Sequence, residues 1–275
     1  MKLFFELIDI LESSTSNVGS KALNLAKANT NGIEVPASYI LPSSYVAQEY
    51  FNDIRRELKS IIDENSLYAV RSSASVEDMD KHSAAGIFDS FIAIKGCEAI
   101  FEAIMNCYKS FNSNVANKYI NIGNQHIYGG IIIQKLINAK RSGVAIIGRP
   151  AINCVMAEGV WGLAIPLVSG MVNPAFLIYN IDVSEITQIH NSEQDVICVP
   201  APLGEGIINE NKRFDDMPFF DQMLVKNLID LSNKVINIFG KQYEIEWAED
   251  YDGKVWLIQA RPLVSKTLFS NIARS

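Results

Sequence analysis

LYAVRSSASVEDMDKHSAAGIFDSFIAI, residues Leu67–Ile94, is the stretch from which we interpret the rest of the chain. Its first four residues form a short β-prone run that ends at Arg71, and small, mostly hydroxylated residues follow. Alternating apolar residues from Ile87 to Ile94 predict a second strand that pairs back onto the first. A guanidinium at a strand end, beside residues small enough for an anion to approach the main chain, suits phosphate oxygens. A surface turn with one solvated arginine has the same composition, so both interpretations of the Arg71 loop remain open.

The segment before this stretch predicts a helix with a lysine at its N-terminus. In SNVGSKALNLAKANTNG, residues 16–32, Ser16 or Asn17 can cap the helix and Asn31-Gly32 can close it. Lys21 then lies in the first turn, where the helix dipole disfavours a cation unless an anion is also present. A solvated surface lysine is the other interpretation. Two scaffold helices are expected over about 44–62 and about 98–119.

Apolar runs in the second half of the chain predict further strands. IIIQKLI, residues 131–137, and SGVAIIG, residues 142–148, are expected to pair through a turn at 138–141 and to form the floor of a pocket. A helix is expected over about 218–239. The glycines between these elements have neither the GxGxxG spacing nor a GxxxxGK[ST] motif, which excludes a dinucleotide fingerprint and a P-loop.

Composition limits the possible partners. The chain has 275 residues, 48% of them apolar, and a net charge of −7 that no Lys/Arg-rich block offsets. We therefore expect neither nucleic acid nor a membrane as a partner. Glu6 and Asp9 interrupt the apolar run at the N-terminus, so we expect no signal peptide, no membrane span and a cytoplasmic location. The four cysteines form no CxxC pair and are expected to be reduced and structural.

YEIEWAEDYDGKVWLIQARPL, residues 243–263, predicts a hairpin with a defined register. Asp252-Gly253 favours a two-residue type I′ turn, which pairs Tyr251 with Lys254 and continues outward from there. In that register Glu244 lies opposite Arg261 and Glu246 opposite Gln259, with all four side chains on one face. The other face is expected to be apolar and to contain Tyr243, Ile245, Trp247, Trp256, Ile258 and Ala260.

Two carboxylates, an amide oxygen and a guanidinium on one face suit a hard cation beside an anion clamp. Mg²⁺ takes oxygen ligands from protein, phosphate and water, so the pair Glu246 and Gln259 is a candidate metal site. The other interpretation is a solvent-facing hairpin on which Glu244 and Arg261 form a salt bridge worth under about 1 kcal/mol. A register shifted by one residue would put Glu246 and Gln259 on opposite faces and exclude the metal site.

Five segments of the chain, in this order, resemble the blocks of one family. They are VGSKALNLAKANTNGIEVPASYIL, YAVRSSASVEDMDKHSAAGIFDSF, IIIQKLINAKRSGVAIIGRP, GLAIPLVSGMVNP and YEIEWAEDYDGKVWLIQARP, and they span about Val18 to Pro262. Together they are similar to the ATP-binding domain of phosphoenolpyruvate synthase and pyruvate phosphate dikinase. The resemblance implies an α+β fold of the ATP-grasp type, in which two lobes, roughly 1–130 and 131–265, clamp Mg-ATP. Residues 266–275 are expected to be a tail.

The resemblance also implies roles for single residues. Lys21, Arg71 and Arg261 match the family's phosphate-binding and catalytic residues, and Glu246 and Gln259 match its metal ligands. The further residues expected to bind the cofactor are Glu244, beside Arg261, and Gln134, Leu136 and Ile137, which match the edge whose main chain meets adenine.

The chain also departs from the family. Val115 stands where the family has an arginine, with Lys118 as a possible substitute, and Ile165 replaces an acidic residue of the glycine-rich block. Losing a cation and a carboxylate from a phosphoryl-transfer site can cost several kcal/mol of transition-state stabilisation. His82, His126 and His190 match no phosphohistidine block and are expected to be surface residues, although His82 lies in the loop that follows Arg71.

The leading hypothesis is therefore an ATP-dependent phosphotransferase domain that is only part of an enzyme. In the family a phosphoryl group passes from ATP to a histidine on a separate swivelling domain, in the same chain or another, and then to pyruvate or another small acceptor. Relatives with the same ATP domain phosphorylate an antibiotic or an amide instead. Val115 and Ile165 motivate a second hypothesis, a non-catalytic nucleotide-binding or regulatory module. A carboxylate–amine ligase of the ATP-grasp type is a third.

Overall fold

The computed structural model describes residues 2–12, 18–74, 90–111, 129–149, 152–192, 194–202, 206–212, 214 and 217–263. The chain divides into two compact units. Unit 1 comprises Met1–Thr30, Val35–Leu136 and Pro200–Ile207, and unit 2 comprises Asn31–Glu34, Ile137–Val199 and Ile208–Ser275. Within the described part of the chain, no helix is both long enough and apolar enough to cross a membrane.

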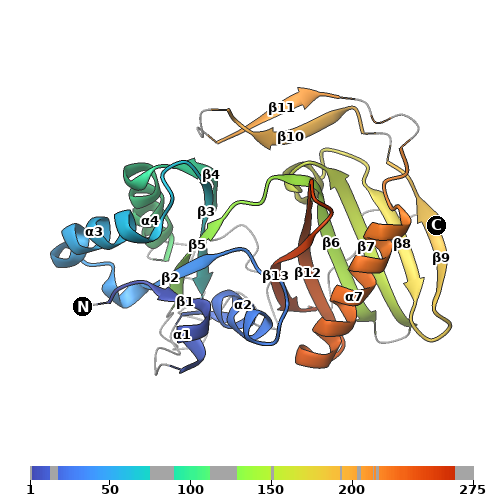
Figure 1. Cartoon of the computed structure of the whole chain (residues 1–275), viewed down its shortest axis with the longest axis horizontal. Helices are drawn as coiled ribbons and strands as arrows, with labels where there is room; N and C mark the ends of the chain where they lie inside the picture. The colour runs from blue at the N-terminus through green and yellow to red at the C-terminus, as the bar shows by residue number, and fades with distance from the viewer. Residues whose placement is uncertain are drawn as a thin grey trace. The chain divides into compact units, whose positions relative to one another are not determined.

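Unit 1 is built on a five-stranded antiparallel sheet with the order β1-β2-β5-β3-β4 (Figure 1). Its strands are β1 (Phe5–Glu6), β2 (Ser38–Pro42), β3 (Leu67–Ala74), β4 (Ser90–Lys95) and β5 (Gly129–Lys135). Its helices are α1 (Leu7–Glu12), α2 (Ser20–Thr30), α3 (Phe51–Ile61) and α4 (Cys97–Phe111). The helix expected from about residue 44 begins at Phe51, because two 3₁₀ turns, Ser43–Tyr45 and Gln48–Tyr50, precede it.

The side chains of β3 alternate between the two faces of this sheet. Tyr68, Val70 and Ala74 belong to the apolar core that also contains buried residues of α3 and α4, such as Ile54 and Ile104. The alternate residues of β3, Arg71 among them, therefore lie on the opposite face.

Unit 2 is built on a six-stranded antiparallel sheet with the order β13-β12-β6-β7-β8-β9. Helix α7 (Gln222–Phe239) packs across one face of this sheet (Figure 1). The strands are β6 (Ala139–Arg149), β7 (Ile152–Trp161), β8 (Ala175–Asn180), β9 (Glu185–His190), β12 (Tyr243–Asp250) and β13 (Val255–Pro262). A short helix α6 (Ile165–Val168) and the paired strands β10 (Val196–Pro200) and β11 (Ile207–Asn211) complete the described elements.

An ion pair fixes the start of α7 to the sheet of unit 2. Arg141 is buried and donates to both carboxylate oxygens of Glu249, at 2.5 and 2.7 Å. It also pairs with Asp221 at 2.9 Å and donates to the carbonyl oxygen of Phe219. The carboxylate of Asp221 caps α7 by accepting from the N–H of Leu224 at 2.9 Å. The expected helix over 218–239 therefore begins at Gln222, where this cap is.

The predicted pairing of 131–137 with 142–148 is wrong. The first run is β5, which lies between β2 and β3 in the sheet of unit 1. The second run is in β6, which lies between β12 and β7 in the sheet of unit 2. The residues between the two strands therefore connect two sheets, and the expected pocket floor does not form.

The C-terminal hairpin has the predicted outer pairs but not the predicted turn. Glu244 lies opposite Arg261 and Glu246 opposite Gln259, as predicted. Nearer the turn the partners shift by one residue, so that Trp247 faces Leu257 across a β-bulge. Gly253 has a φ of 80°, but Asp252 lacks the positive φ that a type I′ turn requires. The turn is instead longer, with Asp250 N–H donating to the oxygen of Lys254 at 3.0 Å.

The bulge also changes the apolar face of the hairpin. Leu257 is buried opposite Trp247, on the face that was predicted to contain Trp256 and Ile258. Trp256 lies opposite Ala248 and donates its ring N–H to Asp250. The extra residue of the bulge, Ile258, lets Leu257 and Gln259 lie on opposite faces although they are two positions apart.

Candidate functional site

In unit 1, the N-terminus of α2 lies against the end of β3. The N–H of Ala22 donates to Ser73 Oγ at 3.1 Å, and Lys21 Nζ donates to the carbonyl oxygen of Ser72 at 3.4 Å. Gly19 approaches β3 so closely that a Cβ there would lie 2.1 Å from the Ser73 oxygen. Lys21 is thereby placed beside the residue that follows Arg71.

Arg71 lies on the α2 side of the unit 1 sheet. It is on the same face of β3 as Ser73, the residue that contacts α2. It pairs with Ser90 of β4 and Ile132 of β5. The structure therefore places the two predicted phosphate-binding cations, Lys21 and Arg71, on the same side of unit 1.

The segment expected to meet adenine lies at the end of β5 and after it. Gln134 is buried and pairs with Ser38 on one side and Ala69 on the other, so its main chain belongs to an interior strand. The N–H of Leu136 donates to the oxygen of Leu67 at 2.8 Å. Of the predicted main-chain donors, the amide of Leu136 is thus engaged in a hydrogen bond inside unit 1. Ile137 is the first residue of the unit 2 segment Ile137–Val199.

In unit 2, four polar residues of the hairpin share the sheet face opposite α7. They are Glu244, Glu246, Gln259 and Arg261. Arg261 donates to Glu244 Oε1 through Nε, at 2.9 Å, and through Nη2. Glu244 and Gln259 are buried, and Glu246 and Arg261 are partly exposed. The buried Glu244 Oε2 has no hydrogen-bond partner among the described residues. The interpretation as a solvent-facing hairpin is therefore wrong for Glu244 and Gln259, which are buried.

The donor set of this face fits a hard cation. Glu246 and Gln259 contribute a carboxylate and an amide oxygen from directly opposite positions, and Glu244 adds the unpartnered oxygen. Groups of three or more His, Cys, Asp or Glu residues arranged to hold a metal do not occur within the described residues. A Mg²⁺ ion held by these oxygens would complete its coordination with phosphates and water.

Sequence reasoning missed one carboxyl group on the same face. Glu158 of β7 lies opposite Val144 of β6, which in turn lies opposite Glu246. Its side chain is only 4% exposed, and its Oε1 has no hydrogen-bond partner in the described structure. Burial raises the pKa of Glu158 to about 7. A lone acidic residue inside the buried strand INCVMAEGVW was the available signal.

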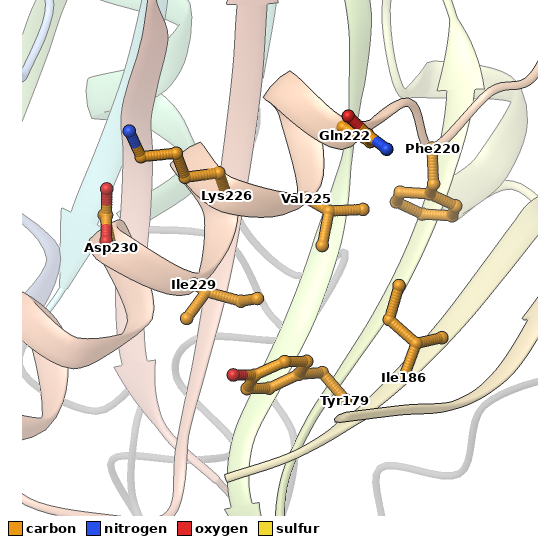
Figure 2. A pocket seen from close by; sticks show the side chains of 8 residues that line it. All are labelled: Tyr179, Ile186, Phe220, Gln222, Val225, Lys226, Ile229 and Asp230. Carbon is orange, nitrogen blue, oxygen red and sulfur yellow. The ribbon is translucent and has the colours of Figure 1, made fainter. Parts of the chain in front are cut away.

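A hollow of about 370 Å³ lies on the other face of the unit 2 sheet, beside α7. Figure 2 shows Tyr179 and Ile186 of β8 and β9 pointing toward Val225 and Ile229 of α7, with Lys226 and Asp230 at the rim. None of the predicted site residues lines this hollow. Because paired residues share a face, Tyr179 and the hairpin residues Glu244 and Glu246 point to opposite sides.

Some residues of interest lie elsewhere. His82, Val115, Lys118 and His126 are outside the described residues. His190 is exposed on β9, as predicted, and Ile165 begins the short helix α6. All four cysteines are buried and unbridged.

Residues 46–268 match the family model described as pyruvate phosphate dikinase, AMP/ATP-binding domain. The chain belongs to this family. The matched range contains Arg71, Glu246, Gln259 and Arg261, and it begins after Lys21.

Relatives extend the match over most of the chain. A probable phosphoenolpyruvate synthase of Methanocaldococcus jannaschii is 32% identical over 206 residues, which cover 72% of this chain and 17% of the relative. Phosphoenolpyruvate synthase of Pyrococcus furiosus is 26% identical and covers 94% of this chain and 33% of the relative. The phosphotransferase YvkC of Bacillus subtilis is 25% identical over a match that covers 92% of this chain and 34% of the relative. The chain thus spans no more than about a third of these relatives.

Among solved structures, the chain is similar to PH1788 from Pyrococcus horikoshii, with 12% sequence identity and a TM-score of 0.49 over 95% of this chain and 97% of that one.

Proposed function

We propose that this chain is the nucleotide-binding part of a phosphotransferase, and that units 1 and 2 are the two lobes of one ATP-grasp-like domain over residues 1–265, followed by a tail. The observation that carries the proposal is the match of residues 46–268 to an AMP/ATP-binding domain. The two clusters of charged residues support it. One is cationic, with Lys21 and Arg71, and the other combines an ion pair with oxygen donors on a single sheet face.

Each cluster has a proposed role. Lys21, Arg71 and Arg261 bind phosphate oxygens, and Arg261 is oriented for this by its two donations to Glu244. Glu246 and Gln259 bind Mg²⁺, which when present neutralises charge on the transferred phosphoryl group. The adenine edge is assigned to the segment around Ile137, since the amide of Leu136 is already used by Leu67.

The acceptor in this proposal is a histidine on a swivelling domain, in the same chain or another. One phosphoryl group of ATP goes to this histidine and the other goes to water as inorganic phosphate, so AMP is the nucleotide product. Pyruvate is the proposed final acceptor, because relatives that match the chain are phosphoenolpyruvate synthases. A non-catalytic nucleotide-binding module is the second candidate, since Ile165 stands where the family has an acidic residue. We expect the first candidate to transfer a phosphoryl group and the second only to bind.

Titration calorimetry with Mg-ATP, together with an assay for AMP release, tests the proposal. The isolated chain should bind Mg-ATP in the micromolar to millimolar range and release AMP only when a histidine-bearing partner domain and pyruvate are added. Binding without AMP release under both conditions would favour the module. Absence of binding at millimolar Mg-ATP would contradict both candidates.

The variant Lys21→Met should bind Mg-ATP more weakly than the wild type, because it removes one of the proposed phosphate-binding cations. Its matched control is Lys59→Met, which removes an exposed lysine of α3 in unit 1. It should bind Mg-ATP as the wild-type protein does. Any loss of affinity in Lys21→Met beyond that of Lys59→Met then reports the specific position rather than the change in net charge.

A further inference from the structure

Glu158 is an unusual carboxyl group for the interior of a sheet. It is 4% exposed, and its Oε1 has no hydrogen-bond partner among the residues that the structure describes. Its pKa is raised to about 7 by burial, with no charged neighbour contributing. A buried acid without a partner costs folding free energy, so its presence calls for a compensating interaction in another state of the protein.

The strand pairing places Glu158 in line with the candidate metal ligands. One continuous row crosses four strands through directly opposite residues, and its members are Gln259, Glu246, Val144 and Glu158. Directly opposite residues of an antiparallel sheet point to the same face. Glu158 and Glu246 are therefore separated by about 10 Å, two strand spacings, with only the short Val144 between them.

Among the described residues, the immediate neighbours of Glu158 on its face of the sheet include no cation. Along the row, Phe176 of β8 lies on its far side, and along β7 the residues on the same face are Met156 and Val160. All of these side chains are apolar. Among the described residues of this face, Glu244, Glu246 and Arg261 lie on the hairpin, where Arg261 donates to Glu244. The titratable residues His190 and Glu185 lie on β9, beyond Phe176, and both are exposed.

We propose that Glu158 is a further oxygen ligand, direct or through one water, of the divalent cation that accompanies the nucleotide on this sheet face. The inference rests on the proposed function, because it takes Glu246 and Gln259 as the first ligands. Glu158 and Glu246 lie two strands apart on one face, so both could approach a single cation above Val144. Water and phosphate oxygens would supply the remaining ligands, because Mg²⁺ seldom has a purely protein ligand set. The cation provides the charge that this buried carboxyl lacks, and its approach drives the proton off Glu158.

The test is calorimetric and does not depend on turnover. Mg-ATP, with Mg²⁺ in excess, is titrated into the wild-type chain at pH 7 in buffers of different ionisation enthalpy, which gives the number of protons exchanged on binding. Because a group with a pKa of about 7 is half protonated at this pH, the wild-type protein should release about half a proton more than Glu158→Gln. Glu158→Gln should also bind Mg-ATP at least about 10-fold more weakly, in line with the loss of one charge-assisted contact.

The matched control is Glu185→Gln, which makes the same change on an exposed position of β9. It should change neither the proton count nor the affinity. Thermal unfolding of Glu158→Gln checks that the variant is folded, which we expect because glutamine has the same size and carries no buried charge. If wild-type and Glu158→Gln bind Mg-ATP with equal affinity and equal proton release, the inference is wrong while the proposed function remains. If the wild-type chain does not bind Mg-ATP at all, both are wrong.

Discussion

Glu158 and Glu249 are both buried in the unit 2 sheet, but among the described residues Glu249 has a cationic partner and Glu158 has none. Arg141 donates to both oxygens of Glu249, so that carboxylate is neutralised on the α7 side of the sheet. Glu158, on the opposite face, has an oxygen without a partner in the described structure. We therefore expect the two carboxyl groups to affect the free energy of unfolding in different ways.

The first prediction concerns pH. The pKa of Glu158 rises from its ordinary value of 4.5 to about 7 on folding, so the folded state binds a proton that the unfolded chain has lost between these two pH values. Stability should thus fall as pH rises through this window, and the fall should end above about pH 7. The free energy of unfolding of Glu158→Gln should rise relative to that of the wild type by up to about 3 kcal/mol as the pH is raised from about 5 to about 8. Urea unfolding at both pH values measures the difference, and a constant difference would contradict the assignment.

The second prediction concerns Arg141. Arg141→Met leaves the charge of Glu249 buried and uncompensated, which should cost about 3–5 kcal/mol in the free energy of unfolding. The double variant Arg141→Met/Glu249→Met removes both charges and should recover most of this loss. Urea unfolding of the two variants decides the matter, because a double variant as unstable as the single one would show that packing, not charge, is responsible.

At the scale of elements, the start of α2 depends on a close approach to β3. Gly19 has a φ of 81°, and a Cβ would lie 2.1 Å from the Ser73 oxygen and 2.5 Å from Ser73 Oγ. Ser73 Oγ is also the acceptor for the N–H of Ala22. The helix turn that carries Lys21 can therefore keep its position only with glycine at residue 19.

We predict that Gly19→Ala destabilises the chain by roughly 2–4 kcal/mol, the sum of a left-handed backbone penalty and a steric clash. It should also weaken Mg-ATP binding, because Lys21 is displaced. Gly32→Ala is the matched control, since Gly32 has a φ of 75° with nothing within 4 Å of its Cβ position. The control should cost only about 1–2 kcal/mol and leave Mg-ATP affinity unchanged. Equal effects in unfolding and calorimetry would mean that the contact with Ser73 is unimportant.

At the scale of the whole molecule, the prediction concerns residues of both units. Lys21→Met in unit 1 and Glu246→Gln in unit 2 should each weaken the same binding event by at least about 10-fold, because each removes a charge-assisted interaction with one ligand. Calorimetry should give one Mg-ATP per chain for the wild type. Two binding events, each sensitive to only one of the variants, would contradict a shared nucleotide.

Local patterns were sufficient to predict several parts of this protein. The register counted from a turn at Asp252-Gly253 correctly predicted that Glu244 lies opposite Arg261 and Glu246 opposite Gln259, although the turn itself differs from the predicted one. The α+β class was also predicted correctly, through the family resemblance. Asp252-Gly253 alone did not determine the turn. The longer turn shifts the pairing by one residue, and the bulge at Ile258 shifts it back, so the outer pairs keep the predicted register.

The pairing of distant strands required the tertiary structure. Runs 131–137 and 142–148 are adjacent and apolar, and both are strands, yet β5 and β6 belong to different sheets because their partners come from remote parts of the chain. Glu158 was overlooked for the same reason: it is 88 residues from Glu246, and three strands had to pair before the two could share a face. Sequence by itself determined the elements and the charged residues of this protein. Tertiary structure decided which of them meet, because strands that are far apart in the chain find their partners through long-range contacts that no local pattern encodes.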